Sequence, residues 1–158
     1  MVSMGQVLVL TMVGLALVIV GAQLSQQGED GDGGDDSILD VCLESHSNDL
    51  KHYHVSMELF IRGEAALIPA DVGVSAKCMR GIHTHSSDGT LHIETPSTME
   101  ARAEHFFAIW DQPFNSLHLL NHVAEDGEKV SMTVDGVEVE DFENHVLVDG
   151  QTIVIKLE

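Results

Sequence analysis

A stretch of strict alternation across residues 51–61 is the feature that most constrains the fold of this chain. Its apolar members are Tyr53, Val55, Met57, Leu59 and Ile61, and its polar members are His52, His54, Ser56 and Glu58. Successive side chains of a β-strand point to opposite faces of a sheet, so the pattern predicts a half-buried strand. Turn residues 62–64 then lead into a short apolar run that Pro69 closes, which predicts a hairpin.

Short strands separated by turns account for most of the remaining pattern. The further predicted strands cover residues 80–85, 90–94, 129–134, 137–139, 145–148 and 152–157. One helix is expected after Ser97, an N-cap residue with Glu100 three positions on, because apolar side chains recur at helical spacing from Met99 to Trp110. These signals predict an all-β sandwich or barrel with one short helix.

An apolar N-terminal segment precedes this domain. The first 27 residues carry no charged side chain, and residues 1–24 are long enough to cross a bilayer, which takes about 20 residues. We expect a transmembrane anchor or a signal peptide there, and we favour a retained anchor because no basic residue begins the segment. Residues 25–37, rich in Gly and Asp, are expected to form a flexible acidic linker to a β domain at 38–158.

The charge distribution indicates where the domain resides. Acidic side chains follow the apolar segment directly, which favours a single-pass protein of the cell membrane with its C-terminal domain outside the cytoplasm. The whole chain has 26 acidic against 7 basic residues, a formal charge of −19. That charge repels phosphate backbones, so nucleic acid is not an expected partner. Solubility in salty surroundings explains the acidity better than a substrate site does.

Three segments place imidazole or carboxyl groups two residues apart on predicted strands. The pairs are His52 with His54, His83 with His85, and His92 with Glu94. Each pair shares one face of its strand while apolar neighbours take the other face. If the strands are neighbours, the imidazoles converge, and converging neutral imidazoles are ligands for zinc, copper or iron.

We expect His83, His85 and His92 to be metal ligands, because a short turn joins their two strands. His52 or His54 would complete the set, and Glu94 would orient a ligand. A hydrogen-bonded structural cluster and a solvated strand face remain as alternatives. The other histidines lack this alternation and are expected to be ordinary surface or hydrogen-bonded residues: His46, His105, His118, His122 and His145. No glutamate separates His118 from His122 as a zinc protease requires, so a hydrolase is not favoured.

The only two cysteines, Cys42 and Cys78, precede the first two histidine pairs. Outside the cytoplasm an even cysteine count favours a disulfide, which we predict here. The alternative is that Cys78, five residues before His83, serves as a thiolate ligand in a copper site.

Several of these segments together resemble an uncharacterised prokaryotic family of small membrane-anchored or secreted histidine-rich β proteins. Its pattern is a His-x-His strand, a turn with Pro, a Cys, His-Thr-His-Asp, Ile-His-x-Glu, Phe-Phe-x-x-Trp and a C-terminal hairpin. The matching residues are His52, His54, Pro69, Cys78, His83, His85, His92, Glu94, Phe106, Phe107 and Trp110. Ser86 stands where the family has Asp. The resemblance supports the domain boundaries and the histidine positions and implies no reaction.

Taken together, the sequence predicts a membrane-anchored domain that binds a transition metal without catalysis, as a carrier, sensor or assembly factor. Copper or zinc is expected, with iron as a further option. A redox or oxygenase-like metalloenzyme is the second hypothesis, so enzymatic activity stays open. A structural subunit of a membrane protein complex, with hydrogen-bonded histidines, is the third.

Overall fold

A computed structural model describes residues 37–44, 46, 50–96 and 99–158. The predicted apolar segment 1–24, and the predicted linker up to residue 36, lie outside the described residues. Within the described ranges, no helix is long and apolar enough to cross a membrane.

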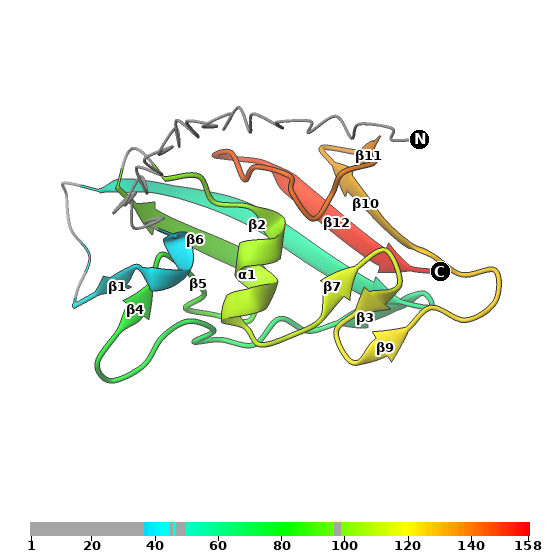
Figure 1. Cartoon of the computed structure of the whole chain (residues 1–158), viewed down its shortest axis with the longest axis horizontal. Coiled ribbons are helices and arrows are strands. Elements are labelled where there is room, and N and C mark those ends of the chain that lie inside the picture. The colour runs from blue at the N-terminus through cyan, green and yellow to red at the C-terminus, as the bar shows by residue number, and fades with distance from the viewer. Residues whose placement is uncertain (1–36, 45, 47–49, 97–98) are drawn as a thin grey trace, which may run out of the picture. The chain divides into compact units, whose positions relative to one another are not determined.

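One seven-stranded sheet forms the framework of the domain (Figure 1). Its main path is β11 (Val137–Val139), β10 (Val130–Val134), β12 (Thr152–Leu157), β2 (Lys51–Ile61), β6 (Thr90–Thr95) and β5 (Ile82–His83). The short strand β3 (Glu64–Ala66) pairs with the end of β2. The path is open at β11 and β5 among the described strands.

The C-terminal strand β12 lies between β10 and β2, and it runs parallel to β2. Its register pairs Thr152 with Ser56 and Leu157 with Ile61. The neighbouring pairs β10–β12, β10–β11 and β2–β6 are all antiparallel. The last strand of the chain therefore joins the C-terminal hairpin to the central strand β2.

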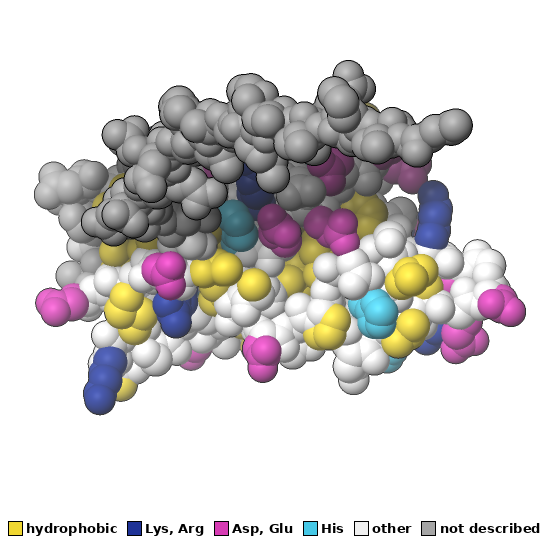
Figure 2. All heavy atoms as spheres, viewed as in Figure 1, with side chains coloured by type: hydrophobic (Ala, Val, Ile, Leu, Met, Phe, Trp, Pro, Cys, Tyr) yellow, Lys and Arg dark blue, Asp and Glu magenta, His cyan; other side chains and the backbone are white. Residues whose placement is uncertain are grey.

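The apolar face of β2 is the floor of the hydrophobic core. Val55, Met57 and Leu59 are each only 1% exposed. The helix α1 (Ala103–Ile109) buries Phe106 and Phe107 in the same core and crosses the sheet in Figure 1. The alternating histidines of β2 must therefore point to the opposite face. On the side seen in Figure 2, histidine side chains appear only singly.

Two small β units flank the main sheet. The strand β1 (Cys42–Leu43), which follows the 3-10 turn η1 (Ile38–Asp40), pairs with β4 (Met79–Arg80). A three-stranded sheet comprises β7 (Phe114–Asn115), β8 (His118–Leu119) and β9 (His122–Val123). His118 and His122, four residues apart, thus lie on strands rather than on a helix.

The helix begins later than the sequence suggested. It starts at Ala103 with Arg102 as N-cap, whereas Glu100 lies before it and Ser97 lies outside the described residues. The reason is competition from a distant segment, because the amide of Ala103 donates to His145 O (3.0 Å) and Ala101 O accepts from Leu147 (2.8 Å). These bonds hold the backbone before Ala103 extended.

The same pairing explains why residues 145–148, predicted as a strand of a hairpin, are not one. They make a single bridge, Val146 with Arg102, instead of joining the main sheet. The broader prediction is confirmed: the described residues are mostly β-sheet with one short helix.

Gly89, at the turn before β6, lies against the backbone of β2, where its carbonyl accepts a hydrogen bond from the Met57 amide at 2.8 Å. Its φ is +83°, and a Cβ there would lie 2.3 Å from Met57 O. We expect Gly89→Ala to lower the free energy of unfolding by about 3 kcal/mol, measured by urea denaturation. Gly127→Ala is the matched control, because Gly127 has φ +91° with nothing within 4 Å. Gly127→Ala should lower the free energy of unfolding by about 1 kcal/mol. Equal losses in the two variants would mean that the contact with Met57 does not contribute.

Candidate metal centre

The strand registers gather five of the six residues singled out from the sequence, and a side-chain contact adds His85. In the β2–β6 pair, His52 lies opposite Glu94 and His54 opposite His92. In the β5–β6 pair, His83 lies opposite His92. Directly opposed residues share one face of the sheet. His85 follows β5 and lies 3.2 Å from His83, measured between the two Nε2 atoms.

A seventh residue, His46, joins them from the segment between β1 and β2. Its Nδ1 forms a close contact with Glu94 Oε1, and its ring lies 5.3 Å from that of His85. Sequence reasoning left His46 out because it lies in no alternating strand. The only available signal was its place four residues after Cys42.

Three overlapping sets of side chains have ligand atoms within 4.8 Å of one another, and two of these sets consist of histidines alone and share no residue; the third joins His46 and His52 with Glu94. We call His46, His83 and His85 group A, and His52, His54 and His92 group B. In group B, His92 Nδ1 lies 3.1 Å from His54 Nε2 and 3.5 Å from His52 Nε2. Two nitrogens bound to one tetrahedral zinc ion stand about 3.3 Å apart. Both groups therefore could hold a metal ion.

Outward hydrogen bonds orient a ring in each group. His83 Nδ1 lies 2.9 Å from the backbone oxygen of Arg80. Because a carbonyl oxygen only accepts, Nδ1 carries the hydrogen and Nε2 keeps its lone pair, which faces His85. In group B, His52 Nδ1 lies 3.3 Å from Glu94 Oε1, while its Nε2 faces His92. Such outward partners are typical of metal-bound histidines.

Glu94 is the buried centre of this face. Its side chain is 0% exposed, whereas those of His46 and His52 are 52% and 39% exposed. Oε1 contacts both of these imidazoles, and Oε2 has no hydrogen-bond partner among the described residues. A buried carboxyl oxygen without a partner is energetically costly, so a further donor or a cation at Oε2 would stabilise it.

Burial also holds two imidazoles in the neutral form. Desolvation, aided by the neighbouring His85 and His92, lowers the pKa of His83 to about 4. Desolvation and the nearby His54 lower the pKa of His92 to about 4 as well. Both rings can thus offer a lone pair to a metal at neutral pH without first losing a proton.

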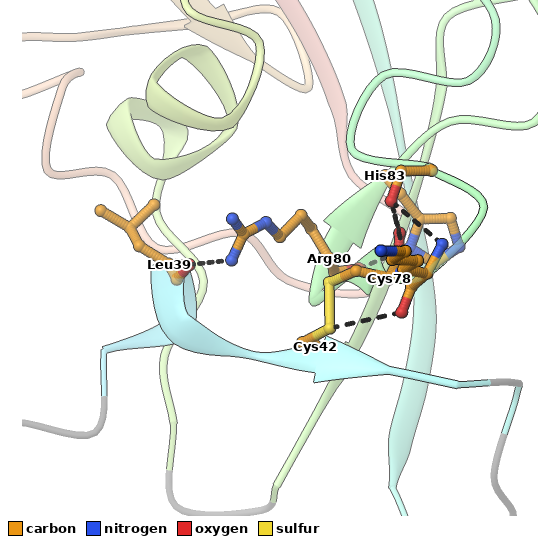
Figure 3. The surroundings of a disulfide bond; sticks show 7 residues. Leu39, Cys42, Cys78, Arg80 and His83 are labelled. Carbon is orange, nitrogen blue, oxygen red and sulfur yellow. Dashed lines mark hydrogen bonds between the residues drawn. A yellow bond between two sulfur atoms is a disulfide. The ribbon is translucent and has the colours of Figure 1, made fainter.

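A disulfide between Cys42 and Cys78 ties β1 to β4, with a Cα–Cα distance of 5.1 Å. Figure 3 shows it beside Arg80 and His83. Arg80 links the two sides again, because its guanidinium donates to Leu39 O at 2.8 Å and its own carbonyl accepts from His83. The segment that carries His46 is thereby fastened to the strand that carries His83. With its sulfur in this bond, Cys78 is not a thiolate ligand here.

The remaining histidines lie elsewhere, and three of them have local partners. His105 accepts a hydrogen bond from the Arg102 amide at the start of α1. His118 contacts Asn115, and His145 contacts Gln151.

Comparisons with protein-family models, curated proteins and solved structures found no match for this chain.

The pKa of His83 predicts how the metal-free domain responds to acid. Its folded pKa, about 4, is below the ordinary value of 6.5, so the unfolded chain takes up protons first as pH falls. Stability should be constant above about pH 6.5 and decrease from there towards pH 4. His83 alone accounts for up to about 3 kcal/mol, measured as urea unfolding free energy against pH. His83→Gln should flatten this dependence; an unchanged slope would contradict the assignment.

Proposed function

We propose that this protein is a membrane-anchored domain outside the cytoplasm that binds a transition metal through its histidine face, in a carrier, sensor or assembly role. The observation that carries the proposal is the convergence of imidazole lone pairs. His52 and His83 each direct Nδ1 to an outward oxygen, so each turns its Nε2 towards other imidazole nitrogens. Only a cation or a proton stabilises several lone pairs at one point.

A purely hydrogen-bonded cluster accounts less well for group B. His52 donates through Nδ1, so its neutral ring has no hydrogen on Nε2. A hydrogen on His92 Nδ1 could then serve either His52 or His54, and one of the two contacts would stay unsatisfied. A metal ion would satisfy all three nitrogens, which favours binding over a structural role.

The ligand set favours copper or zinc, with iron as a further option. Imidazole nitrogens suit all three metals, and the described cluster contains no sulfur ligand. The formal charge of −19 also raises the local concentration of cations at the protein surface.

Metalloenzyme chemistry is the second candidate, and the exposure of His54 and His85 favours it. Exposed ligands leave one side of a bound ion open to a small molecule, as catalytic sites require. Redox cycling or oxygen consumption by the metal-loaded chain would identify this function.

Metal binding is tested with the full chain, purified in a mild detergent and stripped with a chelator. We expect tight binding of Zn²⁺ or Cu²⁺ by calorimetry. The double variant His54→Ala with His85→Ala removes an exposed ligand from each group and should weaken binding about 100-fold or more. Because both side chains are exposed, the fold should persist.

The matched control is His118→Ala with His122→Ala, which removes two histidines from the separate three-stranded sheet. It should bind metal as the unaltered chain does. Equal weakening by both double variants would indicate nonspecific binding to histidines, and no binding by the unaltered chain would leave the structural cluster as the better account.

The proposed membrane topology is supported by the uncharged segment at residues 1–24 and the acidic residues after it. Protease added to intact cells should degrade the domain and leave a short membrane-held fragment. Protection of the domain until the cells are lysed would place it on the cytoplasmic side.

A further inference from the structure

We propose that the histidine face is a two-metal centre, in which group A and group B each hold one transition-metal ion and Glu94 couples them. This inference rests on the metal-binding function proposed above and adds a second ion to it. The alternative is one ion that takes its ligands from both groups.

Ring orientations within each group are compatible with one ion per group, although His85 and His92 also meet at 64° across the boundary. Within group A, His83 and His85 meet at 71°, and within group B, His54 and His92 meet at 86°. Tilted rings can aim their in-plane lone pairs at a common point. Between the groups, His46 stacks on His52 and His83 stacks on His92, at interplanar angles of 13° and 16°. His46 and His52 also belong to a further possible ligand set with Glu94, so the division into two sites rests on the two histidine triplets that share no residue.

The groups still lie next to each other. The stacked pairs have centroid separations of 5.7 Å and 5.5 Å, and the closest rings across the boundary, His85 and His92, are 4.7 Å apart. Two ions held by these rings would be near neighbours. Sites of that kind act as a pair on one small bridging ligand, such as hydroxide.

Glu94 links group A to group B through its contacts with one histidine of each. Its Oε1 contacts Nδ1 of His46, a member of group A, and Nδ1 of His52, a member of group B. One buried carboxyl oxygen therefore orients one imidazole of each group. The second oxygen, Oε2, is buried and without a hydrogen-bond partner among the described residues, so this carboxyl is not fully satisfied by the protein alone.

The stoichiometry of the stripped full chain in detergent tests this proposal. After loading with Zn²⁺ and gel filtration, elemental analysis should find two ions per chain. His85→Ala, in group A, and His54→Ala, in group B, should each retain one ion. His122→Ala, on β9, is the matched control and should retain two.

Cu²⁺ provides a second readout that does not depend on affinity alone. The first equivalent should give the paramagnetic resonance spectrum of an isolated ion, and the second should give the dipolar-coupled spectrum of a close pair. In His54→Ala and His85→Ala the coupled spectrum should be lost. Glu94→Gln should weaken binding of both ions about 10- to 100-fold, because it orients a ligand in each group.

One ion in the unaltered chain, with binding abolished by either single variant, would overturn the two-metal centre and leave a single mixed site. Two ions without magnetic coupling would also overturn it, because the ions would then not be neighbours. No ion in the unaltered chain would overturn the proposed function itself.

Discussion

The register between β2 and β6 is the constraint on which the rest of this structure depends. It sets His52 opposite Glu94 and His54 opposite His92 while it places Val55 and Leu91 together in the core. A shift of one residue would exchange the faces, moving imidazoles into the apolar core and valine and leucine into solvent. The hydrophobic effect on one face of the sheet thereby holds the histidine cluster together on the other.

Glu94 distinguishes the histidine-bearing face of the sheet from an ordinary solvent-exposed surface, because its carboxyl group is buried. It is fully buried although it carries a carboxyl group, and the contacts of Oε1 are imidazoles rather than lysine or arginine side chains. Burial of such a group is unfavourable unless polar partners surround it. His83 and His92 lie in the same cluster, and desolvation lowers the pKa of each. Buried titratable groups of this kind are found more often at functional sites than in purely structural regions.

The polar face is also held from outside the sheet. The Cys42–Cys78 disulfide and the Arg80–Leu39 hydrogen bond fasten the segment before β2 to β4, and the Arg80 carbonyl in turn accepts from His83 on β5. The geometry of the histidine cluster thus depends on strand pairing, a disulfide and a side-chain hydrogen bond between segments that are distant in sequence. Rigid support of this kind suits preorganised ligands, since less ordering is left for the binding step.

The sequence by itself determined the local elements: the strand at residues 51–61, the β3 hairpin, the Asp-Gly turn between β10 and β11, and the common face of each histidine pair. These follow from side-chain period and turn chemistry, which act over a few neighbouring residues. Only the tertiary structure decided that β12 lies parallel to β2, that α1 starts at Ala103, and that His46 reaches Glu94. Those outcomes depend on backbone pairing and side-chain contacts between distant segments, which periodicity does not encode.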